Sequence, residues 1–260
     1  MSRSLSRRAL LGLAVAGLAA GCAKAVRSAP APTPAPAATA SAVPTITTSV
    51  SYPPTSTAST GSSTEVVHGP RDGQQVALTF HGQGDPAIAT AVLTALAAAH
   101  AKVTVMAVGT WLDANPSMAG AISSAGHELG NHTWSHPALA SLSEQSIRAE
   151  IARCRDTLIR LTGTPGAYFR QSSAQYSTPL IRTVAGQLGY PVCLSYDVDS
   201  LDWTDPGPAS IRRAVAAATA GSIVSMHFGH QGTVAALPGI LHDFTARGLS
   251  PVTVSTLLRA

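Results

Sequence analysis

The feature that most constrains the fold is a regular alternation of short and long apolar patterns between Gln75 and Leu258. The short runs are rich in β-branched residues, which favours strands, whereas the longer stretches carry apolar residues at helical spacing. The expected strands are Val76–Phe80, Lys102–Val108, His127–Asn131, Ala167–Arg170, Val192–Tyr196, Ser222–His227 and Pro251–Val254. The expected helices are Pro86–Ala99, one opening at Asn115-Pro116, Ser143–Leu161, Thr178–Gln187, Ser210–Ala220 and Val234–Arg247. This alternation predicts an α/β fold with a parallel sheet, either closed as a barrel or doubly wound.

The N-terminal part of the chain has a different composition. Three arginines precede the apolar run Ala9–Ala20, which is too short for the roughly 20 residues of a membrane span and is typical of a secretory signal. The run ends in Leu18-Ala19-Ala20-Gly21-Cys22, which resembles a bacterial lipobox, and Arg7-Arg8 resembles a twin-arginine export signal. We therefore expect a lipoprotein signal peptide at residues 1–21 and lipidation of Cys22. The predicted product is an exported protein of the bacterial cell surface.

Residues 22–64 are expected to form a tether, because alanine, proline, serine and threonine dominate this stretch and favour an extended chain. The folded domain is then expected at residues 65–260. Within it, twelve Lys and Arg face thirteen Asp and Glu, so the net charge of +4 comes from the N-terminal part. A near-neutral domain argues against a nucleic-acid partner. Cys154 and Cys193 could form a disulfide or remain free, and we expect a monomer.

Ionisable side chains concentrate where the predicted strands end. In parallel βα folds the functional site lies at this edge of the sheet. His132 and His136 are four residues apart, so a helical turn would bring both imidazoles to one face, where they could bind a divalent metal such as zinc together with a third ligand. His227 is a candidate general acid beside a carboxylate from Asp199 or Asp202. The other histidines, His68, His100, His127, His230 and His242, are expected to be structural or exposed.

Several motifs, taken in order, resemble those of the polysaccharide deacetylases of the NodB-homology family, also called carbohydrate esterase family 4. The matching segments are Gly130–Pro137, Asp199–Trp203, Gly221–His227 and Thr233–Pro238, and the resemblance extends from about Gln75 to Leu258. It implies a single-domain distorted (β/α) barrel of about seven parallel strands. It also implies a metal-dependent hydrolase that removes acetyl groups from an acetylated polysaccharide such as peptidoglycan or chitin.

The same resemblance assigns roles to individual residues. His132 and His136 correspond to metal ligands, His227 to the general acid and Asp202 to the carboxylate that tunes it. Arg170 corresponds to the residue that orients the catalytic base. Tyr196 and Trp203 are expected to contact the substrate, and the cofactor is expected to be a divalent metal, Zn²⁺ above all.

The first motif departs from the family pattern Thr-Phe-Asp-Asp-Gly-Pro, in which the first Asp is the base and the second a metal ligand. This chain has Thr79-Phe80-His81-Gly82-Gln83-Gly84-Asp85-Pro86 instead. The prediction is that His81 acts as base while the longer loop brings Asp85 to the metal. Two alternatives remain open: His81 is itself the third ligand, or no competent site survives.

Two further segments differ from the family. Gln171-Ser172-Ser173 follows Arg170 where the family has a proline-rich segment ending in a tyrosine that helps to hold the oxyanion, and Phe228 follows His227 where an aspartate is common. The leading hypothesis is an active deacetylase. The alternative is a catalytically inactive glycan-binding lipoprotein on a deacetylase-like barrel.

Overall fold

The computed structural model describes residues 61–259, so the predicted signal peptide, Cys22 and nearly all of the predicted tether lie outside the described residues. A parallel sheet with the strand order β4-β3-β2-β7-β6 forms the centre of the domain, and β8 also pairs with β2. A shorter pair, β1-β5, is parallel as well. The strands are β1 Thr64–Val66, β2 Gln75–Gly82, β3 Thr104–Ala107, β4 Glu128–Asn131, β5 Val192–Leu194, β6 Val198–Asp199, β7 Ile223–His227 and β8 Ser250–Val252.

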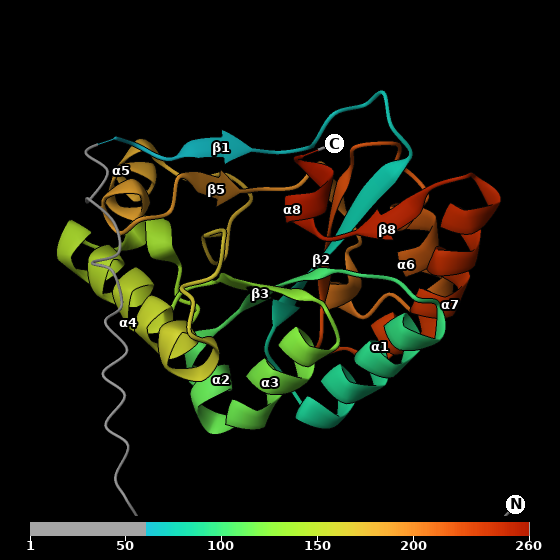
Figure 1. Cartoon of the computed structure of the whole chain (residues 1–260), viewed down its shortest axis with the longest axis horizontal. Coiled ribbons are helices and arrows are strands. Elements are labelled where there is room, and N and C mark those ends of the chain that lie inside the picture. The colour runs from blue at the N-terminus through green and yellow to red at the C-terminus, as the bar shows by residue number, and fades with distance from the viewer. Residues whose placement is uncertain (1–60, 260) are drawn as a thin grey trace, which may run out of the picture. The chain divides into compact units, whose positions relative to one another are not determined.

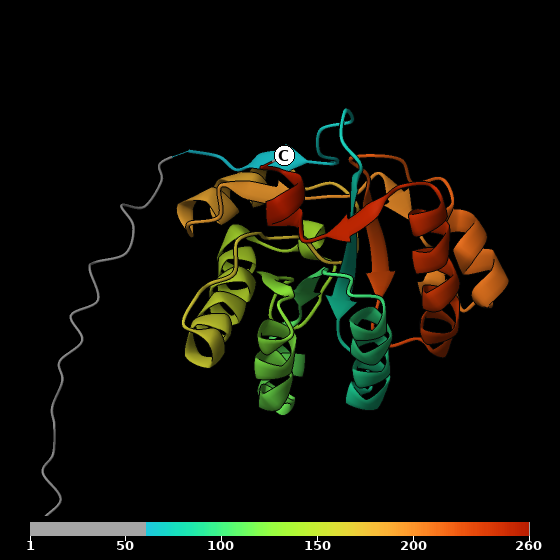
Figure 2. The ribbon, with the colours of Figure 1, turned by 45° about the vertical axis from the view of Figure 1, so that its right-hand side comes forward.

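Helices surround these strands (Figure 1). They are α1 Pro86–Ala98, α2 Gly109–Ala114, α3 Pro116–Ser124, α4 Glu144–Thr162, α5 Pro179–Gln187, α6 Pro208–Val215, α7 Gln231–Ala246 and α8 Val254–Leu257, with 3₁₀ turns η1 Leu139–Ser141 and η2 Asp202–Thr204. Figure 2 shows β2 and β7 side by side with their arrowheads pointing the same way, as parallel pairing requires. Within residues 61–259 no helix is both long enough and apolar enough to cross a membrane.

Local sequence signals explain where several helices begin and end. The Asp85, Ser143 and Thr178 side chains accept hydrogen bonds from the first turns of α1, α4 and α5, which satisfies amide groups that have no partner inside the helix. Proline is the first residue of α1 and α5, where its missing N–H costs nothing. Helix α4 ends at Gly163 in the left-handed conformation (φ 77°) that favours glycine.

The predicted α/β fold with parallel strands is confirmed, and two expected details differ. Ala167–Arg170 is not a strand: only Phe169 forms bridges, to Asn131 on one side and Cys193 on the other. Those bridges link the end of β4 to β5 through Phe169. The segment therefore continues the barrel-like arrangement, although it does not form a regular strand. Strand β1 starts one residue inside the expected tether, because Thr64–Val66 pairs with Val192–Leu194.

The core packs around β2, whose residues Val76–Phe80 are fully buried. A strand buried on both faces is typical of a parallel sheet covered by helices. Cys154 and Cys193 are both buried and free, so no disulfide joins them. Because β2 is fixed on both sides by β3 and β7, the residues at its carboxyl end have defined neighbours.

Candidate metal and catalytic site

Strand register brings the first two histidines of the site together. His81 near the end of β2 pairs with His227 at the end of β7. Their ring centroids lie 4.2 Å apart in an edge-to-face arrangement. The loop after β4 contributes His132 from another side, with a ring centroid 4.2 Å from that of His81. The carboxyl ends of three strands therefore deliver imidazoles to one place, as the parallel fold predicts.

His81, His132 and His136 form a cluster in which one nitrogen from each ring lies within 4.8 Å of the others. The closest pair is His81 Nδ1 and His132 Nε2, at 3.1 Å. Two nitrogen ligands of one tetrahedral zinc ion, each about 2.0–2.1 Å from the metal, lie about 3.3 Å apart. The spacing of the two rings is therefore compatible with a shared ion.

The turn between His132 and His136 is not helical, contrary to the expectation from their spacing. Thr133 (φ 69°) and His136 (φ 59°) both adopt the left-handed backbone conformation, which is uncommon for residues other than glycine. Side chains stabilise this path: Asn131 Oδ1 accepts from the Thr133 amide at 2.9 Å, and Thr133 Oγ1 accepts from the His136 amide at 3.1 Å. The loop thus brings the two rings to a centroid distance of 4.8 Å without a helix.

The cluster favours neutral imidazoles with free lone pairs. Burial, followed by the charges of neighbouring groups, lowers the pKa of His81 and of His132 well below the usual value. The pKa of His136 is lowered too, first by burial and then by His227. His132 Nδ1 lies 3.0 Å from the Arg170 carbonyl oxygen, so Nδ1 carries the proton and Nε2 is left as the lone pair.

One buried atom of the cluster has no hydrogen-bond partner among the described residues, namely His136 Nε2. A buried polar atom normally has a partner, so this nitrogen is one whose lone pair is available for a ligand. Together with the neutral rings and the outer hydrogen bond that fixes His132, it makes the donor set suitable for a divalent metal. Three histidines form a known type of zinc site.

A carboxylate holds His227 on the opposite side of His81. Asp202 is fully buried, and its Oδ1 lies 2.7 Å from His227 Nδ1. Its Oδ2 accepts hydrogen bonds from the His227 amide at 2.8 Å and from Thr233 Oγ1 at 2.6 Å. Burial by itself raises the pKa of Asp202, but the hydrogen bonds and charge of His227 and the Thr233 hydroxyl outweigh it and leave the pKa below its usual value. An ionised carboxylate therefore orients His227 and leaves Nε2 for proton transfer.

Arg170 lies beneath the site and does not bond to His81. Its guanidinium is buried and donates to the carbonyl oxygens of Leu194 and Ser195 and to Thr79 Oγ1, at 2.9–3.0 Å. Burial lowers the pKa of Arg170 to about 10, which still leaves it charged at neutral pH. The residue contacts the cluster through its backbone carbonyl and His132, so the structure gives it a part in fixing a possible metal ligand.

Asp85 lies outside the histidine cluster. Its exposed carboxylate accepts from the Ala87 amide at 2.8 Å and thereby caps α1. The loop before it is held by Trp111 Nε1, which donates to the Gly84 carbonyl. Gly84 itself has φ 95° and packs so closely on Gly229 that an added Cβ would lie 2.5 Å from the Gly229 Cα. In this structure Asp85 therefore caps a helix, and His81 is the third member of the cluster that could hold a metal.

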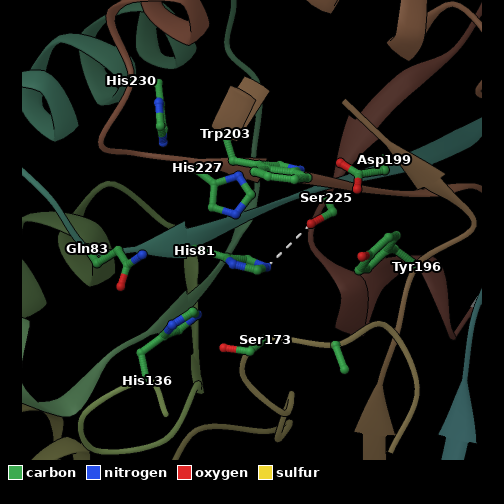
Figure 3. Close-up of a pocket in the computed structure, with 11 residues that line it drawn as sticks. His81, Gln83, His136, Ser173, Tyr196, Asp199, Trp203, Ser225, His227 and His230 are labelled. Carbon is green, nitrogen blue, oxygen red and sulfur yellow. Dashed lines mark hydrogen bonds between the residues drawn. The ribbon is translucent and has the colours of Figure 1, made fainter. Parts of the chain in front are cut away.

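A cavity of about 370 Å³ opens over the imidazoles. Figure 3 shows His81 and His227 at its centre, His136 on one side, and Tyr196 and Trp203 on another. Tyr196 and Trp203, which were predicted to contact substrate, both line this cavity, as does Asp199. Trp203 is 54% exposed, which is unusual for so large an apolar side chain.

Sequence reasoning missed several residues of the cavity: Gln83, Ser173, Ala174, Ser225 and His230. Ser225 Oγ lies 3.3 Å from His81 Nε2. Its strand position two residues before His227 was a usable signal, because alternate residues of a strand share a face. Gln83 and Ser173 lie in the segments that depart from the family pattern. His230, expected to be structural or exposed, lines the cavity as a half-buried residue.

Comparison with known proteins agrees with this geometry. A family model described as polysaccharide deacetylase matches residues 68–193. The chain is 32% identical over 195 residues to a peptidoglycan-N-acetylglucosamine deacetylase of Bacillus cereus, a match that covers 73% of this chain and 91% of that protein. It is 28% identical over 185 residues to the Listeria monocytogenes enzyme PgdA, covering 71% of this chain and 39% of that longer protein.

The fold of a solved structure is also similar. The Bc1960 peptidoglycan N-acetylglucosamine deacetylase superposes with a TM-score of 0.70 at 25% identity, covering 75% of this chain and 93% of that one. The similarity spans 91% of the Bacillus cereus relative and 93% of the Bc1960 structure, but 39% of PgdA. The chain belongs to the polysaccharide deacetylase family, carbohydrate esterase family 4.

Proposed function

We propose that this protein is a metal-dependent deacetylase that hydrolyses the N-acetyl groups of a cell-wall glycan, peptidoglycan above all, at the bacterial cell surface. The observation that carries the proposal is the arrangement of three neutral imidazoles beside an Asp202-held His227 in one open cavity. Such a cavity combines the two requirements of amide hydrolysis, which are an electrophilic centre and a group that transfers protons.

His81, His132 and His136 are the residues that would hold the ion, in place of the aspartate-containing set expected from the family. A divalent cation such as Zn²⁺ at this position supplies polarisation of a carbonyl oxygen and a lowered pKa for water. Because His81 Nδ1 faces His132, His81 would be a metal ligand in this cluster and would not act as the base.

His227 then carries out the proton transfers. Its Nδ1 is occupied by Asp202, so Nε2 is the nitrogen that takes a proton from water as the C–O bond forms. The same nitrogen returns that proton to the departing nitrogen atom as the C–N bond breaks, which yields acetic acid and an amine. At neutral pH the proton of the acid is lost and the amine is protonated, so the final products are acetate and an ammonium group. Asp202 stays ionised and stabilises the imidazolium that forms between the two steps.

The proposed substrate and location rest on separate observations. Tyr196 and Trp203 present aromatic surface at the cavity, which suits the apolar face of a sugar ring. The relatives are named as peptidoglycan deacetylases. The predicted export signal at residues 1–21 and the predicted lipidation of Cys22 would place the domain where a cell-wall glycan is accessible.

The test is to measure bound metal and acetate release from acetylated chito-oligosaccharides and peptidoglycan, for the wild type and for His132→Ala. The proposal expects about one metal ion per chain and acetate release in the wild type, and loss of both in the variant. His242→Ala is the matched control, since His242 is 78% exposed and lies outside the cavity. Absence of both metal and acetate from the wild type contradicts the proposal.

A glycan-binding protein without catalysis is the second candidate. It is favoured by the first motif, where neither acidic position of the family is kept. Gly82 also has no space for a side chain, because an added Cβ would lie 2.9 Å from Val105 Cγ1. This candidate predicts glycan binding with no acetate release from a metal-loaded protein, so the same experiment separates the two.

A further inference from the structure

A second histidine–aspartate pair lies at the cavity, and its construction repeats that of the first. His230 Nδ1 is 2.8 Å from Asp205 Oδ1. Asp205 follows Asp202 by three residues, and His230 follows His227 by three residues. The His227 and His230 rings meet edge-on with centroids 5.8 Å apart. Figure 3 shows His230 above His227, and Trp203 beside His227.

The two histidine–aspartate pairs are carried by the same two segments of the chain. The 3₁₀ turn η2 carries Asp202 at its start, and Asp205 directly follows the turn, with its amide bonded to the Asp202 carbonyl oxygen at 3.0 Å. Asp205 has φ 51°, a left-handed conformation that is uncommon for non-glycine residues but that aspartate adopts more readily than most. On the other side, His227 is the last residue of β7 and His230 directly precedes α7. Trp203 lies between the two aspartates in sequence and lines the cavity.

Stability does not account for this second pair. The Asp205 side chain is 69% exposed and that of His230 is 24% exposed. Exposed ion pairs typically stabilise a protein by less than about 1 kcal/mol. The side chains are nevertheless held in a defined geometry at the wall of the cavity, which points to a role in binding.

The hydrogen bond determines what His230 presents to the cavity. A carboxylate only accepts hydrogen bonds, so the proton of a neutral His230 resides on Nδ1, and Nε2 remains an acceptor. An oriented acceptor in the same cavity as an exposed tryptophan suits a sugar ring, whose hydroxyl groups donate and whose apolar face stacks on an aromatic side chain.

We propose that His230 and Asp205 form a sugar subsite, in which His230 Nε2 accepts a hydrogen bond from a hydroxyl group of a glycan unit seated against Trp203. The subsite deepens the proposed function and rests on it for the class of ligand. The subsite contributes to binding, so it stabilises the bound glycan equally in the ground state and in the transition state.

The experiment titrates the full chain with tetra-N-acetylchitotetraose by calorimetry, after removal of metal so that no acetyl group is lost. His230→Phe is expected to weaken binding about 5–10-fold, the effect of one hydrogen bond. His230→Gln keeps an acceptor oxygen and should bind within about twofold of the wild type, since that hydrogen bond survives. His242→Phe is the matched control, because His242 also has an aspartate neighbour, Asp243 at 3.8 Å, but lies outside the cavity.

Kinetics on the metal-loaded protein provide a second measurement. His230→Phe should raise KM by the same factor while kcat stays within about twofold, as expected when uniform binding is lost. Equal affinity of His230→Phe and wild type, equal losses in the Phe and Gln variants, or no binding of the tetrasaccharide to the wild type would each overturn the subsite. A wild type that binds the glycan but releases no acetate would contradict the proposed activity alone.

Discussion

At the scale of single residues, His81 changes the chemistry of the site more than any other substitution relative to the family pattern. An imidazole where the family has a carboxylate would give three neutral ligands and leave the full charge of a bound ion uncompensated. We predict that His81→Ala loses its metal, with affinity reduced by more than the roughly 10–100-fold seen for outer hydrogen-bond partners of ligands. Metal content after dialysis measures this, and His242→Ala should retain the wild-type content. If His81→Ala keeps one ion per chain, His81 is not a ligand.

Asp202 is the residue whose loss should affect catalysis without affecting metal. Asp202→Asn can present an N–H to His227 Nδ1, which selects the tautomer with its proton on Nε2 and removes the acceptor for the proton of water. We expect kcat to fall about 10²–10⁴-fold, the range of general acid–base catalysis, with an unchanged metal content. Asp199→Asn is the matched control, since Asp199 lines the same cavity but its Oδ1 accepts from the Leu201 amide and not from a histidine among residues 61–259. Equal losses in both variants would contradict the assigned role.

At the scale of elements, the strands and helices with strong local signals could be predicted from the sequence. Strand β2 is a continuous apolar run, and α4 has a serine cap, an amphipathic pattern and a terminal glycine. Strand β1 could not be predicted, because Thr64–Val66 is only three residues long, too short for a periodic pattern, and becomes a strand through its pairing with β5. The Ala167–Arg170 run was predicted as a strand from its composition, but long-range contacts leave it only the bridges of Phe169.

The site residues also divide into those whose positions the sequence predicted and those whose positions it did not. The strand-end rule placed His81, His132 and His227 correctly at one edge, because parallel register depends on the regular pattern of the sheet. The position of Asp85 depends on the packing of Gly84 against Gly229, two residues far apart in the sequence. The approach of His136 depends on two left-handed residues that its spacing from His132 does not reveal. Loop paths set by such contacts are what the sequence alone left undetermined.

The contact between β2 and β3 gives a prediction about Gly82. Its added Cβ would lie 2.9 Å from Val105 Cγ1 and 3.1 Å from Ala107 Cα, both in the buried strand β3. Gly82→Ala is therefore expected to lower the free energy of unfolding by about 1–3 kcal/mol through overpacking. Gly120→Ala in α3 meets nothing within 4 Å and should be neutral or stabilising by up to about 1 kcal/mol. Both variants add one methyl group to a glycine, and denaturant unfolding measures the free energy of unfolding of each. Equal stability of the two variants would contradict the packing argument.

At the scale of the whole molecule, buried neutral histidines should make the metal-free protein sensitive to acid. The folded-state pKa values of His81, His132 and His136 are lowered, and burial, with the charge of Lys102 next, lowers that of His127 to about 4. A depressed folded pKa contributes stability that is present above the unfolded value, about 6.5 for histidine, and is lost as pH falls toward the folded value. The free energy of unfolding should therefore decrease as pH falls from about 6.5 to 4.

His127 allows this to be checked away from the metal cluster. Its Nδ1 accepts from the Val103 amide at 3.3 Å, a bond that protonation would remove. His127→Phe should flatten the pH dependence of stability between about 6.5 and 4, while His68→Phe, at an exposed histidine, should leave it unchanged. Parallel pH profiles for wild type and His127→Phe would show that the buried ring does not control acid sensitivity.

We predict that Cys22 determines where the protein is located. Cys22→Ser should move the protein from the membrane fraction to the soluble fraction of a bacterial host, because the hydroxyl cannot take the place of the thiol in lipidation. Ala23→Ser is the matched control, since it adds the same side chain one position later and leaves Cys22 in place.

Because a single acyl chain gives only marginal membrane binding, wild-type protein that resists washing must carry more than one. Acetate release by the soluble variant should match that of the wild type, since every site residue lies at position 81 or beyond. An unchanged membrane fraction for Cys22→Ser would mean that another part of the chain holds it there.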